Sequence, residues 1–173
     1  MRVGDPPGLW AELGFRVEDD SVAVSGVRLL LGAHDPGLHD WAFGEPAPHA
    51  PPHPNGVAAI DHVVLFTPDL DATVDRLSDE GHDLRRIREA GKGVRQAFFR
   101  LGDVILEVVG PTDGDERLWG ITFTVHDLDA TVAFLGDKVR PPKEAVQPGR
   151  RIATLDTAAG STVPLAFMSP HIR

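Results

Sequence analysis

The segment "AAIDHVVLFTPDLDATVDRL" (residues 58–77) returns in altered form as "RLWGITFTVHDLDATVAFL" (117–135), with the core "DLDATV" identical in both copies. A second pair, "VILEVVGP" (104–111) and "VPLAFMSP" (163–170), lies at nearly the same offset. Two units of similar length and internal order follow, at residues 58–111 and 117–170. A repeat of this kind indicates a fold built from copies of one supersecondary unit.

Each unit predicts a strand, a helix and then further strands. Asp69 is a good helix N-cap, and apolar residues follow it at helical spacing. Gly102 and Asp103 read as a two-residue hairpin turn between two strands. In the first unit we expect strands at 60–66, 84–88, 94–101 and 104–109. In the second unit we expect strands at 119–125, near 150–155 and near 162–168, with Asp127 as the helix cap.

The first 45 residues look like a third, degenerate copy of the same strand-helix-strand module. A short helix ending at Gly14 and a turn at Ser25 and Gly26 carry this prediction. Residues 46–57 form a proline-rich linker, too dense in proline for helix or sheet. His49 and His53 in this run raise the alternative of a metal site, but the proline spacing favours a solvated linker.

The composition excludes several classes of protein. The chain has 173 residues and a net charge of −9, which argues against nucleic-acid and anionic-membrane partners because both need a clustered positive surface. It has no cysteine, so disulfides and thiolate metal sites are absent. The N-terminus lacks a signal peptide pattern and no long apolar span occurs. A cytoplasmic protein of bacterial type is the expectation.

Two polar residues lie in the middle of apolar strands. His62 interrupts the strand at 60–66, and Glu107 interrupts "VILEVV". The hairpin turn pairs Phe98 with Glu107, so strand alternation places Gln96, Phe98 and Glu107 on one face. A carboxylate in an apolar run is costly unless it is paired, protonated or bound to metal. His62 and Glu107 therefore predict half of a metal site, of a type that suits Zn, Fe, Mn or Ni.

The tandem units, with "IDHVVLFTPDLDATVDRL" opening one and "ILEVVGP" closing it, resemble the vicinal oxygen chelate superfamily. This superfamily includes glyoxalases, bleomycin resistance proteins and extradiol dioxygenases. The resemblance implies an α+β fold of tandem βαβββ modules, which form cup-shaped curved mixed sheets with helices on the outer face. It also implies metal ligands on the first and last strands of a module, where His62 and Glu107 lie. The positions equivalent to these in the second unit are Gly120 and Ala166, which cannot bind a metal.

The same polar residues are also compatible with structural roles. His62 could be a core histidine bonded to Glu107, and Glu107 could pair with Arg95 or Arg100. Arg150 and Arg151 could hold an anionic ligand, although arginines in such a run more commonly lie in a solvated loop. His126 falls at a strand-to-helix corner, where we expect it to be exposed.

We expect a glyoxalase-like protein that binds a small apolar or aromatic molecule in its cup. The alternatives are a glyoxalase-type metal-dependent lyase, isomerase or dioxygenase with Glu107 as the catalytic group, and a structural or regulatory protein with a filled cup. The cofactor would be one divalent metal ion held by His62 and Glu107, an incomplete set. The chain would hold three modules, an odd number. One module is then left to pair with a partner chain, which predicts a homodimer. The predicted substrate-binding residues are Gln96, Phe98, Thr122, Thr154 and Met168.

Overall fold

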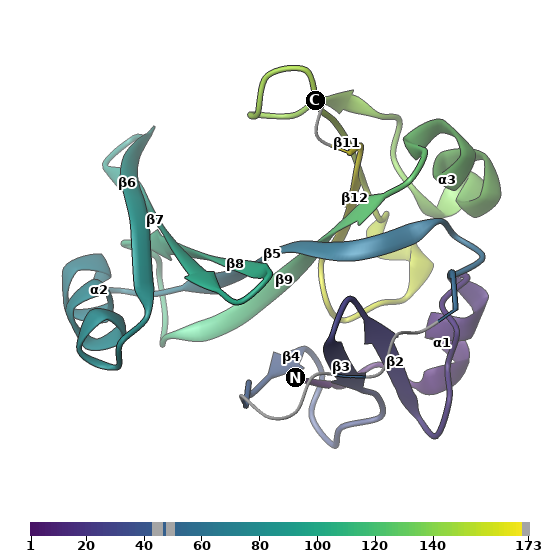
Figure 1. Ribbon diagram of the computed structural model, residues 1–173, viewed down its shortest axis with the longest axis horizontal. Helices are drawn as coiled ribbons and strands as arrows, with labels where there is room; N and C mark the ends of the chain where they lie inside the picture. Colours follow the sequence, from purple (N-terminus) through teal and green to yellow (C-terminus); the bar gives the residue numbers. More distant parts are fainter. Residues whose placement is uncertain (43–46, 48–50, 171–173) are drawn as a thin grey trace. The chain divides into compact units, whose positions relative to one another are not determined.

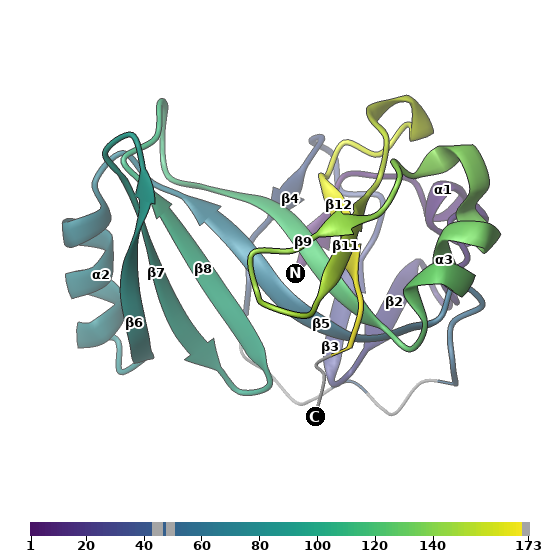
Figure 2. The same ribbon diagram turned by 90° about the horizontal axis from the view of Figure 1, so that it is seen from above.

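The computed structural model describes residues 1–42, 47 and 51–170. The chain divides into two compact units (Figures 1 and 2). Unit 1 consists of Met1–Asp61 and Ile121–Arg173, and unit 2 consists of His62–Gly120. Strands β5 (Val57–Phe66) and β9 (Arg117–Val125) begin in one unit and end in the other.

The N-terminal part of unit 1 forms its own sheet, with strand order β2-β3-β1-β4. Strand β1 runs parallel to β3, which pairs antiparallel with β2 across the predicted turn at Ser25 and Gly26. Both turn residues have positive φ, as a tight hairpin requires. A first strand that runs parallel to one strand of a hairpin is also found in the other two modules. It supports the interpretation of residues 1–45 as a degenerate copy, and that interpretation stays a prediction. The elements are β1 (Arg2–Val3), α1 (Pro7–Glu12), β2 (Ser21–Val24), β3 (Val27–Leu30) and β4 (Leu38–His39).

The C-terminal part of unit 1 pairs its strands in the order β10-β11-β12-β9. Strand β12 runs parallel to β9, and β11 pairs antiparallel with β12. The predicted helix N-cap in this part of the chain is confirmed. The Asp127 carboxylate accepts hydrogen bonds from the backbone N–H groups of Asp129 and Ala130. The elements are α3 (Leu128–Leu135), η1 (Gly136–Lys138), β10 (Lys143–Glu144), β11 (Arg151–Thr154), η2 (Thr157–Ala159) and β12 (Leu165–Met168).

Unit 2 repeats this pattern with the strand order β5-β8-β7-β6. Strand β8 runs parallel to β5 and antiparallel to β7, and β6 is the edge strand. The predicted fold class is confirmed: the chain is α+β, with βαβββ segments and curved mixed sheets that do not close into barrels. The elements are α2 (Leu70–Asp79), β6 (Asp83–Gly91), β7 (Val94–Leu101) and β8 (Val104–Gly110).

Helix α2 covers one face of the unit 2 sheet, as Figure 2 shows. The central side chains of β5, β7 and β8 on that face are apolar and buried, and they alternate along each strand with those of the opposite face. On the edge strand β6, Leu84 and Ile87 share this face but are 37% and 43% exposed. Helix α2 therefore packs on the more uniformly apolar face of the sheet. We call the opposite face the α2-free face. The buried residues on the α2 side are Val63, Leu65, Ala97, Phe99, Leu106 and Val108, together with Leu70, Val74 and Leu77 of the helix.

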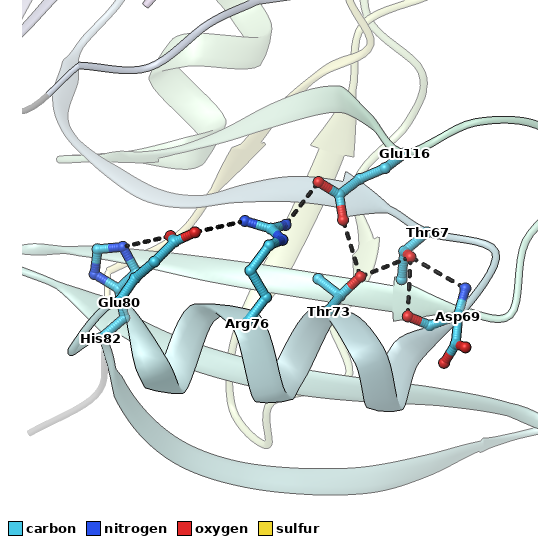
Figure 3. Close-up of polar contacts among 7 residues, drawn as sticks. All are labelled: Thr67, Asp69, Thr73, Arg76, Glu80, His82 and Glu116. Atoms are coloured by element: carbon cyan, nitrogen blue, oxygen red, sulfur yellow. Dashed lines mark hydrogen bonds and ion pairs between the residues drawn. The ribbon is translucent and has the colours of Figure 1, made fainter.

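A polar network ties the segment before β9 to α2 (Figure 3). Glu116 accepts hydrogen bonds from Thr73 Oγ1 at 2.9 Å and from the Arg76 guanidinium at 2.7 Å. Arg76 also binds Glu80, and Thr73 contacts Thr67 Oγ1 at 2.8 Å. Every member has a partner within the network, so we interpret it as structural support for the helix and not as a site.

Aromatic rings fill the core of unit 1. Trp10 and Phe123 are fully buried, and Phe15 packs against both, with ring centroids 4.7 and 5.1 Å away. Trp10 donates through Nε1 to the buried carboxylate of Asp5. Helix α1 is thereby part of the unit 1 core.

His53 is buried, so the prediction of a solvated linker is wrong at this residue. Its Nδ1 accepts from the backbone N–H of Arg16 at 3.0 Å, and its Nε2 lies 3.1 Å from the Ala23 carbonyl oxygen. The ring is therefore neutral, with its proton on Nε2. Both nitrogens are engaged by the backbone, which leaves neither for a metal. His49 lies outside the described residues.

His53 predicts a pH dependence of stability. Burial lowers the pKa of His53 below its usual range. The unfolded chain therefore takes up this proton first as the pH falls, and the contribution of His53 to the free energy of unfolding is full only above about pH 6.5. We expect the free energy of unfolding, measured with urea, to fall between pH 7 and 5. A His53→Gln variant should show a shallower fall. His34→Gln is the control, because His34 is exposed; an unchanged slope in His53→Gln would contradict the assignment.

Candidate functional site

His62 and Glu107 lie together on the α2-free face of unit 2. In the ladder between β5 and β8, His62 is beside Ile105 and Val64 is beside Glu107. His62 Nε2 lies 3.5 Å from Glu107 Oε2, and the two side chains are 14% and 13% exposed. The predicted pairing of Phe98 with Glu107 is also present, because the hairpin turn fixes the register.

The contact extends across the sheet as a polar row. Glu107 Oε1 accepts from the side-chain amide of Gln96, and Gln96 Oε1 accepts from Arg88 Nε at 2.6 Å. The row thus runs through β6, β7, β8 and β5 in the order Arg88, Gln96, Glu107, His62. Arg88 was not predicted as a member of this row. The sequence of β6 has no alternation of apolar and polar residues, so it does not show which side chains lie on which face of the sheet.

The Arg88 contact determines how the Gln96 amide is oriented. The guanidinium Nε carries only a proton to donate, so the Gln96 oxygen must face it and the amide NH₂ must face Glu107. Gln96 therefore presents a donor to Glu107, and its oxygen is already used. Of the alternative partners expected for Glu107, His62 is in contact with it, whereas the two arginines bind elsewhere. Arg95 binds Asp71, and Arg100 binds the Gly102 carbonyl and Asp103.

The donors on this face do not fit a tightly held metal ion. His62 Nε2 and Glu107 Oε2 are the two candidate ligand atoms that lie together here. A divalent ion needs at least three protein ligands to be held well. The Gln96 oxygen faces Arg88, and a guanidinium nearby disfavours a cation. In the described part of the chain, no group of three or more His, Cys, Asp or Glu side chains is arranged to hold a metal.

The remaining predicted binding residues lie in unit 1. Thr122 and Met168 are buried in β9 and β12, and Thr154 is half-buried in β11. Thr122 is beside Ala166, which is beside Thr154 in turn, so these two threonines share one face as predicted. A role of Thr122, Thr154 and Met168 in substrate binding stays a prediction. His126 is exposed at its corner, as expected.

Unit 1 contains a buried ion pair that the sequence did not reveal. Arg150 is 1% exposed, and its guanidinium lies 2.8 Å from Asp61 Oδ1. Arg150 also donates to the Ser169 carbonyl and to Thr124 Oγ1, which itself donates to Asp61. The expectation of a solvated loop is therefore wrong for Arg150. Arg151 pairs with Asp129 at the surface.

The fold agrees with a comparison of the sequence against known families. A family model described as "Glyoxalase/Bleomycin resistance protein/Dioxygenase superfamily" matches residues 9–115. The chain therefore belongs to this superfamily, which confirms the resemblance of the sequence to the vicinal oxygen chelate group. A search of curated proteins found no match.

Solved structures with a similar fold include methylmalonyl-CoA epimerases. The enzyme from Mycobacterium tuberculosis is 20% identical, with a TM-score of 0.57, and the match covers 68% of this chain and 91% of the enzyme. A variant of the Streptomyces coelicolor enzyme, solved with 2-nitronate-propionyl-CoA, is 26% identical, with a TM-score of 0.54 and coverages of 67% and 99%. A hypothetical protein from Bacillus halodurans is 15% identical, with a TM-score of 0.54 and coverages of 66% and 95%.

Among the residues that the structure describes, none of the helices has the length and apolarity needed to cross a bilayer.

Proposed function

We propose that this chain binds a small molecule on the α2-free face of unit 2, without a tightly held metal ion. The observation that carries the proposal is the polar row from Arg88 to His62, which lies on a sheet face that no helix of unit 2 covers. Polar groups inside an apolar surface orient a ligand and give specificity. The epimerase from Streptomyces coelicolor supports the class of ligand, since its structure holds a CoA ester.

The surroundings of the row favour a ligand with an apolar or aromatic part. Val64, Ile105 and Val109 stand on the same face; Val64 is buried, whereas Ile105 and Val109 are half-buried. Beside them Phe66 stacks on Trp119, with ring centroids 4.9 Å apart, and Trp119 is 43% exposed. Covering such side chains on binding would remove apolar surface from water.

The contacts of the Glu107 carboxylate support a role in binding better than a role in catalysis. Both of its oxygens are engaged, one by the Gln96 amide and one by His62. A general base needs a free oxygen within reach of the substrate proton. Glu107 would have to give up one of these contacts before it could act.

The second candidate function is a glyoxalase-type metal-dependent lyase, isomerase or dioxygenase. The short distance between His62 and Glu107 is the observation that favours it. Such a site would need at least one ligand in addition to this pair. A chain with this activity should bind a divalent metal in a one-to-one ratio.

A thermal-shift screen tests the proposal. We expect compounds from a panel of apolar and aromatic small molecules to raise the melting temperature, because a ligand that binds only the folded state stabilises it. The shift should vanish in His62→Ala and Glu107→Gln and persist in the controls His34→Ala and Glu89→Gln, whose side chains are exposed. A panel without any stabilising compound, or shifts that survive both site variants, would contradict the proposal.

Equilibrium dialysis against Zn²⁺, Mn²⁺, Ni²⁺ and Fe²⁺ separates the two candidates. We expect no stoichiometric binding. One metal per chain, lost in both site variants, would establish the metal-dependent candidate instead.

A further inference from the structure

Two arginines of the edge strand β6 stand over one aromatic ring. Arg86 is paired with Phe98 and Arg88 with Gln96, so both side chains lie on the α2-free face. Their guanidinium carbons are 4.7 and 5.3 Å from the centroid of the Phe98 ring. Arg86 is exposed and Arg88 is half-buried. The ring attracts cations, so both guanidinium groups are held against the same Phe98 side chain.

Neither guanidinium contacts a carboxylate among the residues that the structure describes. Arg88 gives Nε to Gln96, and the two terminal nitrogens of its planar fork make no hydrogen bond within that part of the chain. Arg117 of unit 2 also lacks such a contact within the described residues, but it donates to the backbone carbonyls of Asp113 and Asp115. Four other arginines of unit 2 differ, since each ion-pairs with an acidic side chain. These are Arg76, Arg85, Arg95 and Arg100.

This arrangement is unusual for a chain with a net charge of −9. Adjacent like charges repel each other, and an acidic protein has many carboxylates that could neutralise them. Glu107, in the same polar row, is already bound to Gln96 and His62. Guanidinium groups bind carboxylate and phosphate through paired N–H donors, so two of them on one face beside the same ring suit an anion.

We propose that Arg86 and Arg88 bind the anionic group of the small molecule, a carboxylate or a phosphate. This inference rests on the proposed function and specifies its ligand: one end is anionic, and the body lies along the polar row and its apolar neighbours toward Glu107. Phe98 is a positioning residue, because it holds both guanidinium groups at the edge of the face. Ile105 and Val64 provide the apolar surface for the body of the ligand.

Isothermal titration calorimetry with three matched probes tests this inference. The probes are 2-naphthoate, 2-naphthyl phosphate and the neutral 2-naphthamide. Charged hydrogen bonds predict that at least one of the two anions binds about tenfold or more tightly than the amide. Raising the salt concentration should weaken the anion and leave the amide unchanged. The anion that binds more tightly shows whether the site prefers a carboxylate or a phosphate.

The double variant Arg86→Gln/Arg88→Gln should lose the preference for the anionic probes over the neutral amide, while Arg85→Gln should keep it. Arg85 is the matched control because it is an exposed arginine of the same strand that already pairs with Asp83. An equal affinity for all three probes in the wild type, or a preference that survives the double substitution, would overturn the inference. If all three probes bind equally and the binding is lost in His62→Ala and Glu107→Gln, the proposed binding site stands and only the inference about the anion fails. If no probe binds, the result counts against both the proposed function and this inference.

Discussion

Substitution of Arg150 by methionine should lower the free energy of unfolding by about 3–5 kcal/mol, because it leaves a buried charge without its counterion. The Asp61 side chain is 11% exposed and accepts from the Arg150 guanidinium at 2.8 Å. The substitution also leaves the Ser169 carbonyl without the Nε donor. Urea unfolding followed by circular dichroism measures the loss.

Two further variants separate the charge from the packing. The double substitution Asp61→Leu/Arg150→Met removes both charges and should recover most of the lost stability. Arg151→Met is the matched control, because Arg151 pairs with Asp129 at the surface, where ion pairs contribute little. If Arg150→Met unfolds at the same urea concentration as Arg151→Met, the buried pair is not a stabilising element of unit 1.

Substitution of Asp5 by alanine should lower the free energy of unfolding by at least about 3 kcal/mol, because four donor groups lose the same buried acceptor at once. Asp5 is fully buried and accepts from Trp10 Nε1, from Ser161 Oγ at 2.6 Å, and from both the backbone N–H and the hydroxyl of Thr162. These bonds join the N-terminal segment to the segment before β12. The measurement is again the urea midpoint.

Asp35→Ala is the control for Asp5, since the Asp35 side chain is 79% exposed in the same N-terminal region. We expect it to unfold like the wild type. An Asp5→Ala protein as stable as Asp35→Ala would show that residues near the N-terminus do not support the core of unit 1.

Local sequence signals predicted the parts of the fold that depend on neighbouring residues. The turn at Gly102 and Asp103 fixes which residues face each other in β7 and β8, so Phe98 and Glu107 could be paired from the sequence. Asp69 and Asp127 cap their helices as predicted, because an N-cap depends on residues two and three positions further along. The His62–Glu107 pair followed from these same rules.

The long-range polar contacts of unit 1 could not be predicted in this way. Asp5 and Thr162 are bonded across 157 positions, and only the tertiary fold brings such residues together. Arg150 lies in a run of polar and glycine residues that is typical of a solvated loop, yet its partner on β5 buries it. Strand β6 was predicted as 84–88 but spans Asp83–Gly91, because an exposed edge strand lacks the apolar alternation that marks strand ends.

Methyl NMR of protein labelled at Ile, Leu and Val tests the central claim most directly, because neighbouring residues of one strand serve as probes of opposite faces. Ile105 and Val109 stand on the α2-free face, whereas Leu106 and Val108 are fully buried beneath α2. A stabilising compound from the screen should shift the methyl signals of Ile105 and Val109 and leave those of Leu106 and Val108 in place. Shifts at Leu106 and Val108 without shifts at Ile105 and Val109 would contradict a binding site on this face.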